Sequence, residues 1–256
     1  MRNVWAICKR EIKSYFYSPI AYVVIVMFGV IAGWFFFTSM SFYSLLSFQS
    51  MQNPYIRYQL NLTEMVIRPM FGNISIIMLL MLPVVTMRLF SEEKKTGTIE
   101  LLLTYPVSDL QALLGKYIAA LCVFLVMLLF TIVYAFLMAW FGNPESGPLI
   151  TAYIGLLLMG ASFIALGLFA SSLTENQIVA AIIAFGALLL FWVVGWAASI
   201  THGTLADLLR FMSITDHFDN FAKGVLDTSD LVYYATFIIF FLFLTLRVLD
   251  SKRWRG

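Results

Sequence analysis

Six long apolar runs, separated by polar or charged segments, set the pattern of the sequence. A helix needs about 20 apolar residues to cross the roughly 30 Å hydrocarbon core of a bilayer, because lipid cannot satisfy its backbone amides and carbonyls. Each run approaches or exceeds this length, so we expect an all-α polytopic membrane protein in which residues 1–256 form a single transmembrane domain. The spans are predicted at 20–40, 69–89, 113–141, 149–171, 177–199 and 231–249.

Residues 1–18, before the first run, carry an amphipathic pattern. Basic residues alternate there with apolar residues that recur at helical spacing. The apolar residues are Trp5, Cys8, Ile12, Tyr15 and Phe16. This pattern predicts an interfacial helix that lies on the membrane surface before Pro19 turns the chain into the first span. A plain positively charged flank that only sets the topology is an equally weighted alternative.

The connection between the second and third runs, residues 90–112, is charged and closely punctuated. It opens with a solvated cluster: Glu92, Glu93, Lys94 and Lys95. Gly97 interrupts the backbone, and the stretch 98–104 then favours a short helix that Pro106 ends. Ser108 and Gln111 have the spacing of a capping box, which predicts the start of the next helix. We therefore expect a short helix at residues 98–104 that lies on the surface of the membrane domain.

Three further patterns concern how the spans pack. Pro83 removes one backbone hydrogen bond late in the second run and is expected to kink that helix. Small residues in three runs favour close helix packing, and we expect the fourth and fifth spans to lie inside the bundle. These small residues are Gly29, Gly33, Gly155, Gly160, Gly167, Ala180, Ala184 and Gly186. In the short loop between these two spans, Thr174 and Gln177 again have capping-box spacing.

Residues 200–230, before the last run, are polar and acidic with interspersed apolar positions. This mixture predicts short amphipathic helices resting at the outer surface. Ser213 and Asp216 are suited to cap one helix, and Asp227 or Ser229 another.

Composition and charge give the class and the orientation. The chain is 61% hydrophobic and only 12% charged, and its mean hydropathy is +0.90, which is typical of a polytopic membrane protein. Of the 16 Lys and Arg residues, only Arg57, Arg68, Arg210 and Lys223 lie in the connections on one side. The other twelve lie on the side of both termini and residues 90–112, so the positive-inside rule places that side in the cytoplasm.

The sequence offers little candidate chemistry. Asp216, His217 and Asp219, with His202 earlier in the same loop, are the one cluster that resembles a metal-ligand set, and helix-capping residues are the favoured interpretation. No ionisable residue lies near the middle of any apolar run, which argues against a proton relay. The chain also lacks a phosphate-binding Gly-x-x-x-x-Gly-Lys-Ser/Thr loop. We therefore expect no cofactor, no metal and no catalysis in this chain, and energy supplied by a separate motor.

The segment from Arg88 to Ser108, with Gly115-Lys116, resembles the signature of ABC-2 type transporter permeases. The resemblance rests on the Glu-x-x-x-Gly-Thr-x-Glu-Leu-Leu spacing, on Pro106 six residues after Glu100, and on the order of six spans. Within that family the chain looks most like the gliding-motility-associated subgroup, from the segments 214–224 and 245–255.

This resemblance implies a six-helix permease fold like that of type V exporters, with a cytoplasmic coupling helix seated in an ATPase. The residues assigned to this contact are Glu92, Glu93, Gly97, Thr98, Ile99, Glu100, Leu101, Leu102 and Pro106. A second, smaller ATPase contact is assigned to Ser172, Thr174 and Glu175. Contact with a membrane-anchored extracytoplasmic subunit is assigned to Asp216, His217, Phe218 and Phe221.

The same resemblance implies two ATPase copies that hold ATP and Mg, a second permease copy or a sister permease, and a bacterial inner membrane with both termini cytoplasmic. The bilayer is then a partner, and nucleic acid is not. An anchor that transmits ATPase motion without transport is one alternative, and a membrane-embedded enzyme is a weaker one. The substrate is not readable, although apolar spans are compatible with lipid-like, peptide or polymer cargo.

Overall fold

The computed structural model describes residues 2–51, 61–98, 108–142 and 144–253, and every element in these ranges is helical. In chain order the elements are α1 (Arg2–Tyr17), α2 (Pro19–Ser50), the π-helix η1 (Thr63–Ile67), α4 (Arg68–Thr86), α5 (Arg88–Lys95), α7 (Asp109–Gly142), α8 (Ser146–Leu173), α9 (Gln177–Ile200), α10 (Thr204–Met212), α11 (Ile214–Ala222) and α12 (Thr228–Arg253).

Six helical segments are long and apolar enough to cross a membrane, and they lie where the sequence predicts them. They are Pro19–Ser50, Thr63–Lys95, Asp109–Trp140, Ser146–Leu173, Gln177–Ile200 and Thr228–Ser251. The first membrane-spanning helix, α2, extends ten residues beyond the predicted end of the first span and ends at Ser50. No Gly or Pro interrupts residues 41–50, so the helix continues through a stretch that was expected to be loop.

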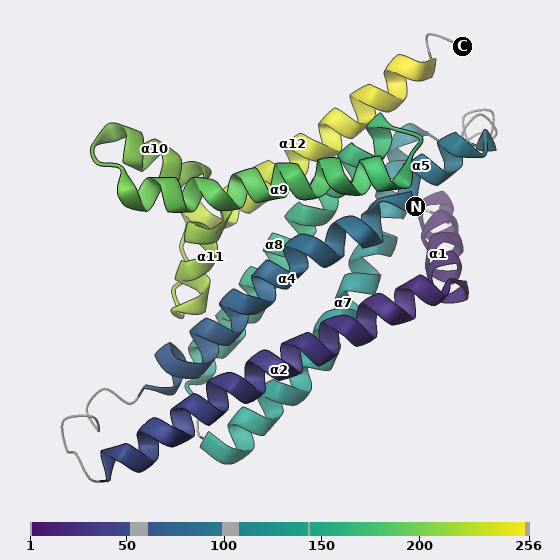
Figure 1. Cartoon of the computed structure of the whole chain (residues 1–256). Coiled ribbons are helices and arrows are strands. Elements are labelled where there is room, and N and C mark those ends of the chain that lie inside the picture. Colours follow the sequence, from purple (N-terminus) through teal and green to yellow (C-terminus); the bar gives the residue numbers. More distant parts are fainter. Residues whose placement is uncertain (1, 52–60, 99–107, 143, 254–256) are drawn as a thin grey trace.

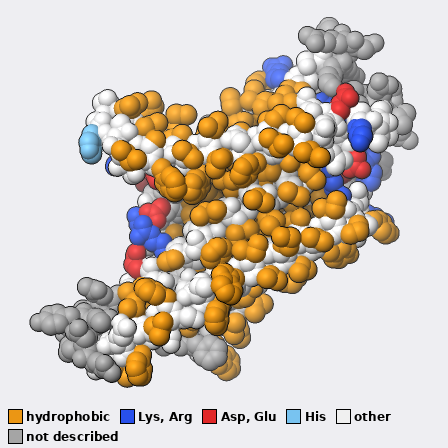
Figure 2. Space-filling model, viewed as in Figure 1, with side chains coloured by type: hydrophobic (Ala, Val, Ile, Leu, Met, Phe, Trp, Pro, Cys, Tyr) orange, Lys and Arg blue, Asp and Glu red, His pale blue; other side chains and the backbone are white. Residues whose placement is uncertain are grey.

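Two ends of the helical bundle can be distinguished in Figure 1. The start of α1, the end of α12 and α5 lie at one end, which we call the termini end. Helices α10 and α11 and the η1 turn lie away from it, at what we call the opposite end. Between the two ends, apolar side chains cover most of the face shown in Figure 2, which is the surface expected of a protein in contact with lipid.

Helix α8 is the centre of the bundle and packs against α4, α9, α11 and α12. Its glycines make these contacts close. A Cβ atom at Gly155 would lie 2.7 Å from Phe221 Cβ, one at Gly160 would lie 2.2 Å from Phe124 Cε1, and one at Gly167 would lie 2.1 Å from Thr86 Oγ1. The predicted role of these small residues is therefore confirmed.

Helix α9 is the exception to the packing predictions. Its side chains at Ile182, Leu190 and Trp196 are more than 60% exposed, and a Cβ atom at Gly186 would meet no neighbour within 4 Å. The expectation that the fifth span lies inside the bundle was therefore wrong for this chain by itself. The fifth span is rich in small residues as expected, but composition does not say which neighbour uses them.

Helix α1 lies against the beginning of α7. Gly115 makes this contact possible, because a Cβ atom there would lie 2.8 Å from Ile7 Cγ2. Cys8 faces Cys122 of α7, and both cysteines are free. The amphipathic helix predicted for residues 1–18 therefore exists, and Ile7, Cys8 and Tyr15 are buried on its inner face while Trp5 is exposed.

Helices α2 and α7 pack through the Gly29 and Gly33 pair. The Tyr134 hydroxyl of α7 donates to the Gly29 carbonyl at 2.8 Å, and a Cβ atom at Gly33 would lie 2.7 Å from the same hydroxyl. The small-xxx-small pair thus serves a contact within the chain.

Candidate functional site

The second span is interrupted shortly after Pro83. Helix α4 ends at Thr86 and α5 begins at Arg88, with Met87 between them. Pro83 cannot donate a backbone hydrogen bond, although its carbonyl still accepts from the Met87 amide at 2.9 Å. The predicted weak point in this span therefore lies one turn before the junction of α4 and α5 at Met87.

Ser171 of α8 bonds to this junction. Its hydroxyl oxygen accepts from the amides of Phe90 and Ser91 at 3.0 and 3.1 Å, and its O–H donates to the Met87 carbonyl at 2.8 Å. The first amides of a helix have no partner within the helix and need an outside acceptor. One buried hydroxyl thus bonds to Met87 at the junction and to the first turn of α5, and it joins α5 to α8.

A second tie joins α5 to the end of α8. The Lys94 ammonium donates to the Ser172 carbonyl, and the Lys94 side chain is largely buried. The two segments assigned to ATPase contact, around Glu92 and around Thr174, therefore lie side by side. Ser172 itself is fully buried, so its side chain does not belong to an exposed surface, while Glu175 is exposed.

The cap of α9 differs from the predicted one. Asn176, rather than Thr174, is the N-cap, and its side chain accepts from the Ile178 amide at 2.9 Å. The Thr174 hydroxyl instead accepts from the Asn176 amide at 3.2 Å. An Asn directly before the helix is the stronger cap, and it overrides the capping-box spacing.

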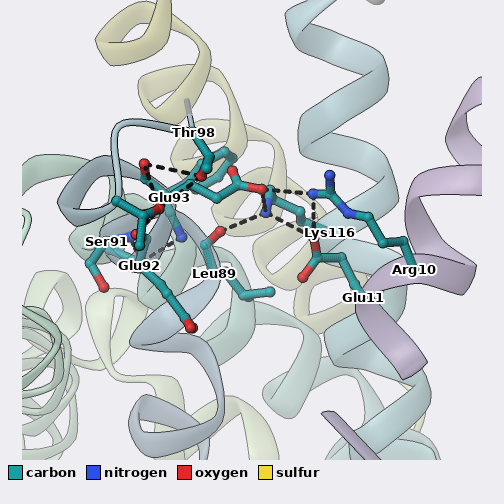
Figure 3. Close-up of polar contacts among 11 residues, drawn as sticks. Arg10, Glu11, Leu89, Ser91, Glu92, Glu93, Thr98 and Lys116 are labelled. Atoms are coloured by element: carbon teal, nitrogen blue, oxygen red, sulfur yellow. Dashed lines mark hydrogen bonds and ion pairs between the residues drawn. The ribbon is translucent and has the colours of Figure 1, made fainter. Parts of the chain in front are cut away.

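Four charged side chains form a cluster where α1, α5 and α7 meet, which we call the charge cluster: Arg10, Glu11, Glu93 and Lys116 (Figure 3). The Lys116 ammonium lies 3.1 Å from Glu11 Oε1 and 2.9 Å from Glu93 Oε1. Arg10 bridges the same two carboxylates at 2.8 and 2.7 Å. Two cations and two anions thus alternate, and the local charges balance.

Lys116 is the buried centre of the charge cluster. Its side chain is only 1% exposed, and it also donates to the Leu89 carbonyl at 2.7 Å. Burial alone would raise the pKa of Glu11, but Lys116 and Arg10 outweigh it and lower that pKa. Since a buried ammonium is costly without partners, this arrangement fixes the relative positions of three helices.

The exposed part of this region follows the charge cluster directly. Glu92 and Lys95 are exposed on α5, and Gly97 ends the helix at a φ of 70°, a left-handed conformation that favours glycine. The Thr96 hydroxyl lies 2.8 Å from that of Thr98. The remaining assigned residues lie outside the described part of the chain: Ile99, Glu100, Leu101, Leu102 and Pro106.

The start of α7 follows the prediction. The Ser108 hydroxyl accepts from the Gln111 amide at 3.3 Å, and the Gln111 side chain accepts from the Ser108 amide at 3.4 Å. This is the predicted capping box. Asn3 of α1 also donates to the Gln111 side chain at 3.2 Å, which adds a further link between α1 and α7.

Most of the residues assigned to contact with an extracytoplasmic subunit, at the opposite end, are buried. Ser213 caps α11 by accepting from the Asp216 amide at 3.2 Å, as predicted, but Phe218 and Phe221 are buried. His217 is also buried, bonded to Asp230 at 2.5 Å and to the Phe211 carbonyl at 3.0 Å. Helix α11 therefore packs on α8 rather than resting at the surface, and Asp216 is the one assigned residue here that is exposed.

Two side chains that build the termini end, Ser171 and Lys116, were not assigned to a site from the sequence, whereas Glu93 was assigned to the ATPase contact and lies in the charge cluster. Ser171 ends an apolar run, and Lys116 is the single charge at the start of another. A lysine at the border of an apolar helix is a signal for a buried acidic partner. Which of the fourteen acidic residues would meet it depends on how α1 and α5 pack.

Within the described ranges, no group of three His, Cys, Asp or Glu side chains is placed to hold a metal ion. The polar contacts of the termini end join helices to one another.

Comparison with known proteins gives the family. No curated protein matches the chain. A family profile described as "ABC-2 family transporter protein" matches residues 5–249, which include five of the six membrane-spanning helices and all but the last two residues of the sixth. Since the match extends over nearly the whole chain, the protein belongs to the ABC-2 transporter family, as a non-catalytic transmembrane permease subunit.

Proposed function

We propose that this permease subunit is driven by a separate ATPase that docks on a coupling surface at the termini end. We define this surface by its exposed residues in the described chain: Glu92, Lys95, Thr96, Gly97, Thr98, Glu175 and Asn176. Ile99, Glu100, Leu101, Leu102 and Pro106, which the sequence assigns to the same contact, lie outside the described residues. The family implies an ABC ATPase partner in general.

One observation supports this proposal above the others: α5 is tied to three other helices. The charge cluster joins α5 to α1 and α7, and Ser171 and Ser172 join it to α8. A protein that moves α5 therefore acts on α7 and α8 through short polar contacts, which are stiffer than apolar packing alone. α5 also follows α4 directly at Met87, where the backbone stays in the α-helical region, so a displacement of α5 reaches this span as well.

Further parts of the proposal concern partners and location. Two ATPase copies hold ATP and Mg, and closure of these copies moves the coupling surfaces of a permease dimer, formed with a second copy or a sister permease. Both termini face the cytoplasm of a bacterium, and the spans cross its inner membrane. A membrane-anchored extracytoplasmic subunit and membership of the gliding-motility subgroup belong to the same proposal.

The cargo is proposed only as a class. Spans without central charges suit a lipid-like, peptide or polymer substrate. The alternative is an anchor that passes ATPase motion to an extracytoplasmic partner. α11 favours this alternative in one respect, because it is bonded through Asp219 to Arg68 at the start of α4 at 2.8 Å, and α4 leads directly to α5.

The docking step is tested by co-purification of the ATPase with tagged permease from native membranes. Glu92→Arg combined with Glu175→Arg reverses two exposed charges on the coupling surface and is expected to reduce ATPase recovery at least about tenfold, as for charge repulsion at a docked interface. Asp207→Arg on exposed α10 is the control, since it reverses one exposed acidic charge at the opposite end. Equal recovery from both variants would refute the coupling assignment.

Transport is tested separately from docking. Proteoliposomes with the permease and its ATPase are supplied with ATP and with lipid, peptide or polymer candidates. ATP-dependent movement of one candidate supports the transporter. Normal ATPase docking and hydrolysis, with none of the candidates moved, would favour the anchor.

A further inference from the structure

A cavity of about 410 Å³ opens at the opposite end between α4, α9 and α11. Its size lies within the roughly 300–1,000 Å³ of small-ligand sites. Figure 2 shows charged side chains gathered in this region, below α10, on a face that is otherwise mostly apolar. The lining includes two indoles and three charged side chains: Trp192, Trp196, Arg68, Asp216 and Asp219.

Gly195 sets the shape of this cavity. A Cβ atom there would lie 2.6 Å from Ser213 Oγ and 3.5 Å from Asp216 Oδ1, so glycine lets the start of α11 approach α9. Trp192 and Trp196 flank this glycine on α9, with ring centroids 4.7 Å apart and planes inclined by 53°. The carboxylate of Asp216 therefore lies beside the part of α9 that carries both indoles.

The charges around the cavity are unequally matched. Arg68 is bonded to Asp219 through two nitrogens at 2.8 and 2.9 Å and to Glu64 at 2.9 Å. Lys223 also pairs with Asp219, at 2.6 Å. Asp216 has no ion-pair partner among the described residues. The cavity thus offers one carboxylate that is not neutralised by direct contact, and its arginine is already engaged.

From this combination of two indoles, one exposed carboxylate and an engaged arginine, we propose that the cavity binds a ligand that carries an alkylammonium group. Aromatic faces attract ammonium groups through the ring quadrupole, and indole does so best. The Asp216 carboxylate supplies the opposite charge. An anion would meet the same carboxylate unfavourably, and an uncharged ligand would cover it without pairing it.

An alkylammonium group has two sources: the head group of a zwitterionic phospholipid and a small soluble amine. Both present the same chemistry to the cavity. The site is independent of the coupling surface, which lies at the other end of the bundle, so its test does not depend on an ATPase.

Tryptophan fluorescence of the purified full chain tests the proposal in a maltoside detergent, which has no ammonium group. Trp192 and Trp196 in the cavity are kept as reporters. The other four tryptophans are replaced with Phe: Trp5, Trp34, Trp140 and Trp254. Tetramethylammonium chloride is titrated at constant ionic strength against sodium chloride, with tert-butanol as the uncharged probe of similar shape.

We expect a saturable emission change with tetramethylammonium only. In Asp216→Asn the half-saturating concentration should rise about tenfold, whereas Asp207→Asn on α10 should match the parent protein. If Asp216→Asn does not fold, Trp196→Leu serves instead, with Trp192 as reporter, and should also weaken binding. The same response to tert-butanol, or unchanged binding in the folded variant, would overturn the proposal.

Nanodiscs distinguish the two sources. If the head group is the ligand, protein in phosphatidylcholine should already show the saturated emission, while protein in phosphatidylglycerol should not. If a soluble amine is the ligand, both preparations should respond equally to added tetramethylammonium. The proposal would be contradicted if the two lipids gave the same emission and the added cation caused no response in either preparation.

Discussion

Replacement of Lys116 with Met tests whether the charge cluster stabilises the termini end. Met keeps the length and apolar stem of the side chain but removes an ammonium that is 1% exposed and bonded to Glu11, Glu93 and the Leu89 carbonyl. Two carboxylates then share only Arg10. Removal of one partner of a buried ion pair typically costs about 3–5 kcal/mol, because the other charge is left buried.

Thermal unfolding of the purified permease in detergent measures this cost. For a chain of this size, the loss corresponds to a fall in Tm of roughly 6–20 °C. Lys95→Met is the matched control, since Lys95 is exposed on α5, and it should change the free energy of unfolding by less than about 0.5 kcal/mol. In a double-mutant cycle with Glu11→Gln, we expect a coupling energy of at least about 1 kcal/mol. Equal stability of the two lysine variants, with additive effects in the cycle, would refute the argument.

Three further outcomes follow from the same contacts. Ser171→Ala should lower the free energy of unfolding by about 1–3 kcal/mol because it removes the buried hydroxyl that bonds to the Phe90 and Ser91 amides. Ser162→Ala removes a hydroxyl that bonds within α8 and should cost less in the same denaturation assay. Gly167→Ala should destabilise by about 1–3 kcal/mol through overpacking, whereas Gly186→Ala, in open space, should be neutral or stabilising. The Glu11 pKa is lowered in the folded protein, so its contribution is complete above the usual value of about 4.3 and is lost as the pH falls below it; Glu11→Gln should flatten this acid-side decrease in Tm.

Much of the fold follows from patterns that the chain carries locally. Six apolar runs give six helices because the length needed to cross a bilayer is a property of each run alone. The Ser108 and Gln111 cap is likewise local, and the structure has it. The extension of α2 to Ser50 lies beyond the span predicted at 20–40, and neither Gly nor Pro stands there to break the helix.

Contacts between distant segments could not be predicted in the same way. Small residues on α8 and α9 look alike in the sequence, yet Gly167 meets Thr86 and Gly186 meets nothing. Phe218 and Phe221 have the spacing of a surface helix, but their burial follows from where α11 packs. Partner choice for Lys116 required the placement of α1, which amphipathicity alone leaves open.

Site-specific photocross-linking in native membranes tests the central claim most directly. A photoreactive amino acid at Thr98, exposed on the coupling surface, is compared with one at Leu205, exposed on α10. We expect the Thr98 position to capture a protein that carries a nucleotide-binding phosphate loop, identified by mass spectrometry, and the Leu205 position to capture none. Capture of that ATPase from Leu205, or its absence from Thr98, would contradict the account.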